Sequence, residues 1–463
     1  LGFGHRGDLR LGLATQGEGH RDEHAHNTEH IGHRVPDGRF GGLKLFGRRG
    51  QRRQRQVQRL QAVAQALHGA GRQLRAHQQP LAGAGGRALS SSKKTAAALA
   101  VIPLVVAADR HGVCLVPYGG GTNVSGALGL EPGDERMIVI VDMSRMNRIL
   151  RVDAEDLTVT VQPGVTRKAL NEAVKSTGLF FPIDPGADAT IGGMSATRAS
   201  GTNAVRYGTM RENVLALEVV TANGEVIRTG TRAKKSSAGY DITRLMVGSE
   251  GTLGVITEVT VRLYPLPEAV SAAICSFPSI EAAVHTTIAT IQMGVPIARV
   301  ELIDTNTVRM VNAYAKLGLN ESPMLLMEFH GSPAGVKEQA ETVQEIAADN
   351  GGQSFEWATT PEERTRLWTA RHNAYFAAIQ SKPGCRAIST DTCVPISRLA
   401  DCLLDSVAEA DASGIPYFLV GHVGDGNFHF GYLIDPNIPA ERETAEALNH
   451  QLVQRALRLE GTC

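Results

Sequence analysis

The stretch Pro117-Tyr118-Gly119-Gly120-Gly121-Thr122-Asn123-Val124-Ser125-Gly126 decides more about the fold than any other part of the chain. It follows the apolar run 113–116 and places four glycines next to polar side chains. Because glycine reaches backbone angles that other residues avoid, successive N–H groups can converge on one anion, usually a pyrophosphate. The loop therefore indicates a dinucleotide cofactor, although a plain turn between strands also fits it. It matches neither the P-loop nor the usual Rossmann spacing.

Two further Gly-rich segments follow, at residues 185–201 and 248–257. The first is made largely of Gly, Ala, Ser and Thr, which lets the backbone lie flat against a bound ring system. The second leads into an apolar run that is typical of a strand. Three such segments in one region are more than turns alone require, so they favour a cofactor site.

The charge of the chain is unevenly distributed. The net charge of all 463 residues is zero, but residues 1–92 carry 14 Arg and one Lys against six acids. This segment fits a nucleic-acid-binding arm or an Arg-rich transit peptide, and it fits disorder or non-native sequence. We favour the latter reading and leave 1–92 unassigned, because most of it lacks the periodicity that buries a core, although 51–75 could form a helix.

The rest of the chain predicts two domains of mixed α+β type. Residues 93–268 alternate strand-like runs with turns and short helical patterns, and 269–463 alternate strands with longer helices. Expected strands are 113–116, 137–141, 157–161, 215–220, 255–263, 272–277, 297–302 and 325–329, and expected helices are 167–176, 280–293, 334–349, 361–380 and 398–412. No apolar run is long enough for a transmembrane segment. The six cysteines are scattered, which argues against a disulfide framework or a zinc knuckle.

The segment Gly421-His422-Val423-Gly424-Asp425-Gly426-Asn427-Phe428-His429 brackets two imidazoles with glycines. This much glycine argues against a helix. A strand–turn–strand bend would bring both rings to one metal ion, since neutral imidazole is a common ligand. A pair of buried, hydrogen-bonded histidines without metal is the alternative.

The order of the three Gly-rich segments resembles the two-subdomain FAD-binding domain of the vanillyl-alcohol oxidase type. The His422–His429 segment, with 368–373 and 389–395, resembles the FAD-dependent D-2-hydroxyacid dehydrogenases, and most of all the group that oxidises D-lactate and passes electrons to cytochrome c. The resemblance covers about residues 96–463. It implies an FAD domain at 93–268, incomplete at its N-terminal end, and an α+β substrate (cap) domain at 269–463. The first loop lacks a histidine, so the FAD is expected to be non-covalent.

The resemblance also implies the site residues. FAD contacts are expected from Pro117, Gly119, Gly120, Gly121, Thr122, Asn123, Gly126, Pro185, Thr190, Gly192, Gly193, Thr197, Ser200, Gly201, Tyr207, Glu250, Gly251, Gly254 and Ile256. Arg371 is expected to pair with the substrate carboxylate. His422 and His429 are expected to hold a divalent metal, Zn or Mn, that binds the substrate 2-hydroxyl. A base then takes the hydroxyl proton while hydride passes from C2 to flavin N5.

The expected substrate is a small 2-hydroxy acid. Relatives that oxidise dicarboxylic 2-hydroxyacids carry a Lys where this chain has Ser389, so a monocarboxylate such as lactate is favoured. Cytochrome c or another acceptor would take the electrons, with no nucleic-acid partner, and a homodimer is one expected assembly. A eukaryotic chain would be mitochondrial, and a bacterial one cytoplasmic or peripheral to the inner membrane face.

The chain departs from the family pattern at both ends. The closing residues 460–463 match the start of a family segment whose Glu, the third metal ligand, and His, the catalytic base, would fall beyond Cys463. We therefore read the cap domain as truncated at its C-terminal end and leave the activity of the chain as written open. A second reading remains: residues 111–149 resemble alkylglycerone-phosphate synthase, a flavoprotein transferase of ether-lipid synthesis with the same flavin fold. A non-enzymatic basic protein is a third.

Overall fold

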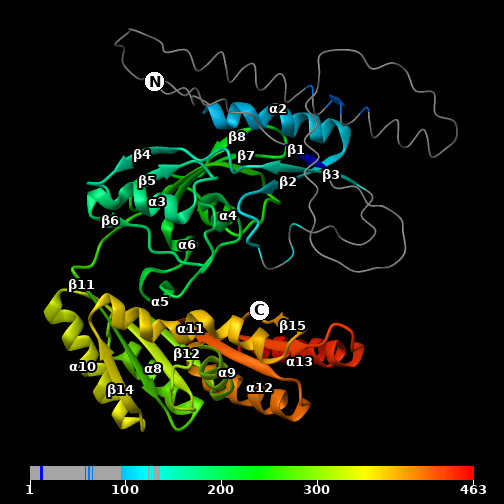
Figure 1. Cartoon of the computed structure of the whole chain (residues 1–463). Helices are drawn as coiled ribbons and strands as arrows, with labels where there is room; N and C mark the ends of the chain where they lie inside the picture. Colours follow the sequence, from blue (N-terminus) through cyan, green and yellow to red (C-terminus); the bar gives the residue numbers. More distant parts are fainter. Residues whose placement is uncertain are drawn as a thin grey trace, which may run out of the picture. The chain divides into compact units, whose positions relative to one another are not determined.

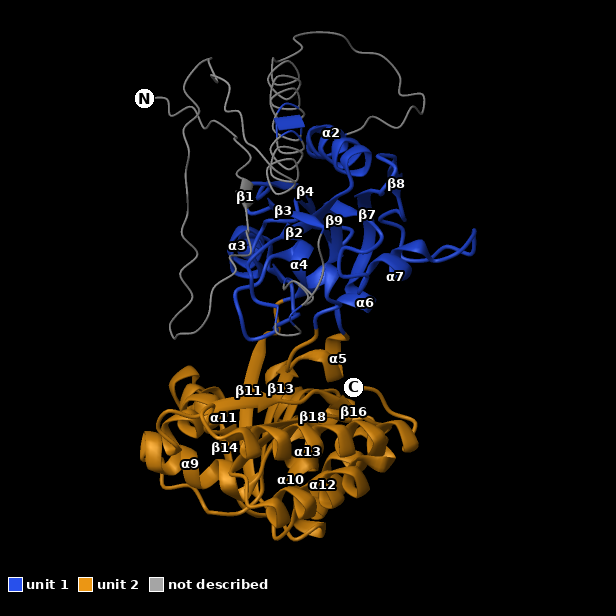
Figure 2. Cartoon of the chain, turned by 90° about the vertical axis from the view of Figure 1, so that its right-hand side faces the viewer, with its two compact units in different colours: residues 1–199, 209–265 blue, residues 200–208, 266–463 orange. Residues whose placement is uncertain are grey.

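The computed structural model describes residues 95–123, 126, 128 and 136–463, the backbone of β1 (Leu11–Leu13), and the helical positions 58, 61, 62 and 65. Those four positions fall within the helix expected at 51–75; the rest of that range and most of the basic segment 1–92 lie outside the described residues. The chain divides into two compact units, coloured separately in Figure 2. The first holds the described residues up to Ala199 together with 209–265, and the second holds 200–208 and 266–463.

The first unit contains a three-stranded sheet in the order β1-β3-β2. Strands β2 (Val113–Tyr118) and β3 (Met137–Asp142) run parallel. Helix α2 (Ala96–His111) packs on them, although its sequence contains Pro103 and we did not expect a helix there. Thr95 caps its start by accepting the N–H of Ala98, Gly112 ends it in a left-handed conformation, and its small apolar face is buried.

A five-stranded antiparallel sheet forms the rest of this unit, in the order β4-β5-β9-β7-β8. Its Val- and Leu-rich face packs against α3 and α4, while α2 covers part of the other face at Val220 and Val255. The elements are β4 (Ile149–Asp153), β5 (Thr158–Val161), α3 (Arg167–Val174), η1 (Lys175–Thr177), β6 (Leu179–Phe180), α4 (Ile191–Ala196), α6 (Met210–Asn213), β7 (Val214–Val220), β8 (Val226–Arg228), α7 (Ile242–Met246), β9 (Val255–Arg262) and β10 (Tyr264–Pro265).

The second unit is built on an antiparallel sheet in the order β14-β11-β13-β12-β17-β18-β15, with β16 also paired to β18. Four helices, α8, α10, α12 and α13, share one core with one face of this sheet, and α9 and α11 share another core with the opposite face (Figure 1). The elements are α5 (Ala204–Tyr207), β11 (Ala269–Ser276), α8 (Ile280–Gln292), β12 (Ile297–Ile303), α9 (Thr305–Ala315), β13 (Met324–Gly331), α10 (Pro333–Asp349), β14 (Gln353–Ala358), α11 (Pro361–Ser381), β15 (Arg386–Ser389), β16 (Thr392–Cys393), η2 (Ile396–Arg398), α12 (Leu399–Ser413), β17 (Tyr417–His422), η3 (Val423–Asp425), β18 (Asn427–Ile434) and α13 (Pro439–Arg458).

Strand β12 shows how this sheet carries polar groups inside the unit. Val300 and Leu302 face one core, whereas Arg299 and Glu301 lie on the opposite face, as period-two alternation requires. The expected strands and helices are confirmed to within three residues at each end. In this unit the sequence analysis did not predict α5, α9, α13, β14, β15 or β16. Of the pair β17–β18 it predicted only the bend between the two histidines.

Candidate functional site

The two histidines lie on adjacent antiparallel strands, which confirms the predicted strand–turn–strand bend. His422 ends β17 and His429 lies on β18, with the short turn η3 between them. Their ring centroids are 5.4 Å apart. Gly426 closes the turn at φ 74°, and a Cβ there would lie 2.1 Å from the carbonyl oxygen of Val394, so only glycine fits. The turn therefore sets the spacing of the two imidazoles.

A buried carboxylate that the sequence reading missed connects this pair to the predicted arginine. Glu301 on β12 has 0% of its side chain exposed. Its Oε1 accepts a hydrogen bond from Nδ1 of His422 at 2.5 Å, and its Oε2 accepts one from Nε of Arg371 at 2.8 Å. The only signal in the sequence was an acid inside an apolar strand. Three of the four groups of this site thus form one hydrogen-bonded set.

The hydrogen bonds fix which nitrogen of each ring carries the proton. A carboxylate and a carbonyl oxygen can only accept, so Nδ1 of His422 donates to Glu301 and Nδ1 of His429 donates to the carbonyl of Thr390 at 3.0 Å. In the neutral rings both Nε2 atoms then carry a lone pair. Metal-binding histidines are commonly held in this way. Among the described residues, none forms a hydrogen bond with either Nε2 atom.

Arg371 lies on α11 and presents the end of its guanidinium to a ligand. Its side chain is 19% exposed, and within the described part of the chain its only hydrogen bond runs from Nε to Glu301. Both terminal Nη groups remain available. A carboxylate fits such a fork through two parallel hydrogen bonds. The arrangement can therefore orient a small organic acid beside the two imidazoles.

Burial and charge set the protonation of these groups. Burial alone raises the pKa of Glu301, but the electrostatic attraction and the hydrogen bonds of His422 and Arg371 hold that pKa below its usual value. Burial, and then the neighbouring His422, lowers the pKa of His429. The site therefore combines an ionised Glu301 with an imidazole at 429 that favours the neutral form.

The segment after β15 supplies the neighbours of His429. Ser389 ends β15, and Thr390 turns its carbonyl toward the ring. Asp391 places Oδ1 3.5 Å from Nδ1 of His429 and accepts a hydrogen bond from Asn427. The segment 389–395, which resembles a motif of the family, thus runs beside β18. Counting described positions only, no three His, Cys, Asp or Glu side chains are arranged to hold a metal ion.

In the first unit, the Gly-rich segments meet one another. Gly119 follows β2 and lies so close to Thr190 that a Cβ would be 2.3 Å from the Thr190 hydroxyl. Thr190 caps α4 by accepting the N–H of Gly193. Gly251 lies against Pro117, since a Cβ there would be 3.6 Å from its ring. The structure therefore brings residues of all three segments together.

Backbone hydrogen bonds hold the third segment against the second. The N–H groups of Gly248 and Glu250 donate to the carbonyls of Ser195 and Ala196. Glu250 adopts a positive φ of 49°, which is uncommon outside glycine. The other predicted residues of these segments have these places: Gly120, Gly121, Thr122, Asn123 and Gly126 follow β2, Pro185 precedes α4, Gly192 and Thr197 lie within and at the end of α4, Gly254 precedes β9, and Ile256 is the second residue of β9.

Three of the predicted cofactor residues, Ser200, Gly201 and Tyr207, belong to the second unit. The Tyr207 side chain is buried there, and its hydroxyl lies 2.8 Å from Nδ1 of His330. His330 in turn contacts Glu328, which also pairs with Arg299. The sequence reading did not anticipate that residues 200–208 pack on the sheet of the second unit.

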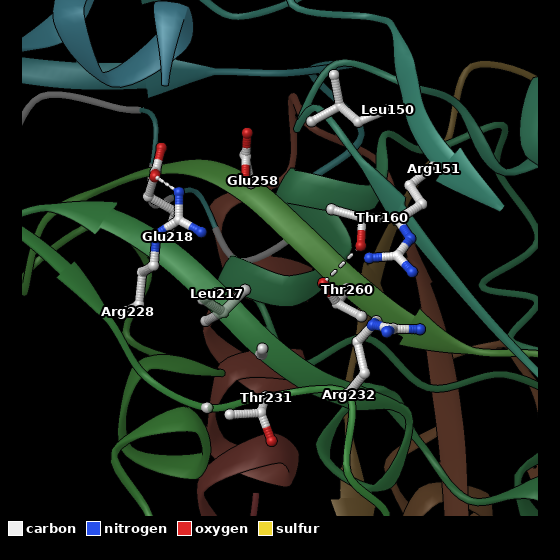
Figure 3. Close-up of a pocket in the computed structure, with 12 residues that line it drawn as sticks. Leu150, Arg151, Thr160, Leu217, Glu218, Arg228, Thr231, Arg232, Glu258 and Thr260 are labelled. Atoms are coloured by element: carbon white, nitrogen blue, oxygen red, sulfur yellow. Dashed lines mark hydrogen bonds and ion pairs between the residues drawn. The ribbon is translucent and has the colours of Figure 1, made fainter. Parts of the chain in front are cut away.

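A groove of about 350 Å³ lies on the five-stranded sheet, on the face that α2 partly covers (Figure 3). Thr160 and Thr260 hydrogen-bond across its floor, and Glu218 pairs with Arg228. Glu258 lies opposite Glu218 on the neighbouring strand. Burial, and then the charge of Glu218, raises the pKa of Glu258 to about 7. None of the predicted site residues lines this groove.

Replacing Glu258 with glutamine should therefore change how stability depends on pH. The unfolded carboxyl loses its proton near pH 4.5 and the folded one near 7, so the native chain loses stability as pH rises through this window. Glu258→Gln removes that loss. Because Glu258 is partly exposed to solvent, we expect a gain of about 1 kcal/mol above the window and none below it. Thermal unfolding at both ends of the window measures it, with Glu155→Gln as exposed control. An equal gain at both ends would contradict the prediction.

No helix in the described residues combines the length and apolarity that crossing a membrane requires.

Known families match both units. Residues 96–230 match the FAD binding domain family, and residues 266–463 match the family of FAD linked oxidases, C-terminal domain. The "Probable D-lactate dehydrogenase, mitochondrial" of Danio rerio is 48% identical over 75% of this chain and 70% of its own length. The "D-lactate dehydrogenase [cytochrome], mitochondrial" of Arabidopsis thaliana is 45% identical over 78% of this chain and 63% of its own length. The chain thus spans about two thirds of these relatives.

Solved structures share the fold. 4-Ethylphenol oxidase from Gulosibacter chungangensis aligns with a TM-score of 0.63 and 19% identity, over 79% of this chain and 78% of its own. An alkyldihydroxyacetonephosphate synthase aligns with a TM-score of 0.61 and 21% identity, over 78% of this chain and 70% of its own. The predicted α+β fold of the vanillyl-alcohol oxidase type is confirmed.

Proposed function

The chain belongs to the FAD-linked oxidases, and we propose that it binds FAD without a covalent bond and oxidises a small D-2-hydroxy acid, D-lactate in the first instance, to the 2-oxo acid. The observation that carries the proposal is the set formed by Glu301, Arg371 and His422 beside His429. A fork for a carboxylate and two imidazole lone pairs next to it match the two functional groups of a 2-hydroxy acid.

In this proposal the first unit holds FAD through its Gly-rich segments. Gly119 and Gly120 lie beside Thr190, where a side chain on Gly119 would collide, and a side chain on Gly121 would collide with Tyr118. Such a row of bare peptide groups suits a pyrophosphate. When bound, FAD supplies the acceptor for the hydride of the substrate C2.

The residues of the second unit bind and orient the acid. Arg371 takes the carboxylate through its Nη groups, while Glu301 holds its Nε. His422 and His429 present Nε2 atoms that fit a divalent cation, Zn or Mn, because both Nδ1 atoms already donate. When bound, such a cation lowers the pKa of the substrate hydroxyl.

The substrate size, the electron acceptor and the location are proposed from Ser389 and from the similar proteins. Ser389 carries no charge for a second carboxylate, which supports a monocarboxylate substrate. A cytochrome as electron acceptor follows the name of the Arabidopsis thaliana relative, and we take it to be cytochrome c. A mitochondrial location follows the names of both relatives and applies if the chain is eukaryotic. The homodimer stays a prediction. The ether-lipid transferase has weaker support, because its likeness to this chain shows the fold alone.

The test uses the purified chain loaded with FAD and Zn²⁺. D-lactate added without oxygen should bleach the flavin absorbance, L-lactate should not, and EDTA should abolish the bleaching. FAD binding without any bleaching by D-lactate, glycolate or another 2-hydroxy acid would contradict the proposed reaction, while absence of FAD binding would contradict the cofactor.

A further inference from the structure

We propose that Glu301 is the positioning residue of this site: one buried carboxylate fixes both the tautomer of His422 and the orientation of Arg371. The inference deepens the proposed function and rests on it for the roles of those two residues. Glu301 itself is fully buried on β12 and would touch neither substrate nor cofactor. Its effect would pass entirely through its two hydrogen bonds.

Each oxygen of the Glu301 carboxylate accepts a hydrogen bond from a different partner. Oε1 is 2.5 Å from Nδ1 of His422, and Oε2 is 2.8 Å from Nε of Arg371. These partners are 121 and 70 residues away in the sequence. Both are donors, so the site needs two acceptor atoms at this point. An ionised glutamate supplies two acceptor oxygens and no donor, whereas a glutamine amide supplies one acceptor oxygen and one donor NH₂ group.

Glutamine at position 301 would keep the shape and reverse one of the two bonds. The Nε–H of Arg371 is always a donor, so the amide oxygen must face it. The amide NH₂ then faces Nδ1 of His422, which can accept only without its proton. The proton of the neutral ring moves to Nε2, and Nε2 loses the lone pair that a metal ion needs. We therefore expect Glu301→Gln to disable His422 as a ligand without removing it.

The chain offers a matched control on the neighbouring strand. Glu328 on β13 is also buried and also joins a histidine to an arginine, with Oε1 2.7 Å from Nε2 of His330 and 3.3 Å from Nε of Arg299. Glu328→Gln introduces the same amide into a similar buried network. It should cost stability in the same way and leave the tautomer of His422 and the affinity for Zn²⁺ unchanged.

The experiment has two readouts, neither of which needs turnover. Nitrogen-15 NMR of the metal-free protein reports which ring nitrogen of His422 carries the proton, and competition with a chromophoric chelator reports the affinity for Zn²⁺ alone. Wild type should show protonated Nδ1, and Glu301→Gln should show protonated Nε2. The affinity of that variant for Zn²⁺ should fall about 10- to 100-fold, the usual effect of losing such an outer partner.

The outcomes separate the inference from the proposed function. Protonated Nε2 on His422 in wild type, or protonated Nδ1 with unchanged Zn²⁺ affinity in Glu301→Gln, would overturn the role of Glu301. If Glu301→Gln does not fold, Glu301→Asp replaces it, since the shorter carboxylate cannot reach both donors and should also weaken Zn²⁺ binding. Failure of wild type to oxidise any 2-hydroxy acid would contradict the proposed reaction. The role of Glu301 would still be tested by the nitrogen-15 NMR of the His422 ring.

Discussion

Replacing Arg371 with lysine is expected to lower kcat/KM for D-lactate roughly 100-fold, with most of the effect in KM. Lysine keeps the positive charge but has one nitrogen in place of a planar fork. It can bond to Glu301 or to the substrate carboxylate in the native geometry, but not to both. Each hydrogen bond to a carboxylate contributes about 1.5–3 kcal/mol, so one lost bond accounts for a change of this size. Steady-state kinetics across D-lactate concentrations measure the effect.

Arg366→Lys is the control for this substitution. Arg366 lies one and a half turns earlier on α11, is more than half exposed, and pairs with Glu356. Its replacement should leave kcat/KM near the wild-type value, because exposed pairs contribute little. Equal kinetic effects of the two variants, or an unchanged KM in Arg371→Lys, would contradict the carboxylate role of Arg371. Zn²⁺ affinity should stay near wild type in both, since neither change alters the Nδ1–H of His422.

The sequence predicted those parts of the site that depend on local pattern. Gly426 and its neighbours rule out a helix, so a bend between His422 and His429 followed from glycine content alone. The three Gly-rich segments could be recognised in the same way. Each of these features lies within a short stretch, where residue type directly restricts the backbone.

The parts that the sequence could not predict depend on long-range contacts. Glu301 looks like any acid in a strand until the fold brings it to Arg371 and His422. Tyr207 is predicted to contact the cofactor from its place in a motif, and nothing in the sequence indicates that its hydroxyl also bonds His330, 123 residues away. Helix α2 was not predicted; it contains Pro103, which disfavours a helix, but burial of its Ala- and Val-rich face outweighs that preference.

Replacing His429 with alanine should abolish measurable Zn²⁺ binding at the site and lower the rate of flavin bleaching by D-lactate about 10³-fold, since a metal ion contributes several kcal/mol to such chemistry. The reason is that His422 alone cannot hold a cation against water. If the two rings were instead a purely structural pair, the variant would lose stability and keep its rate. Thermal unfolding measured alongside bleaching therefore separates the two roles. His450→Ala, which removes an exposed imidazole from α13, is the control and should change neither quantity. Retained Zn²⁺ binding in His429→Ala would remove the metal from the proposal and leave Arg371 as the only substrate contact it names.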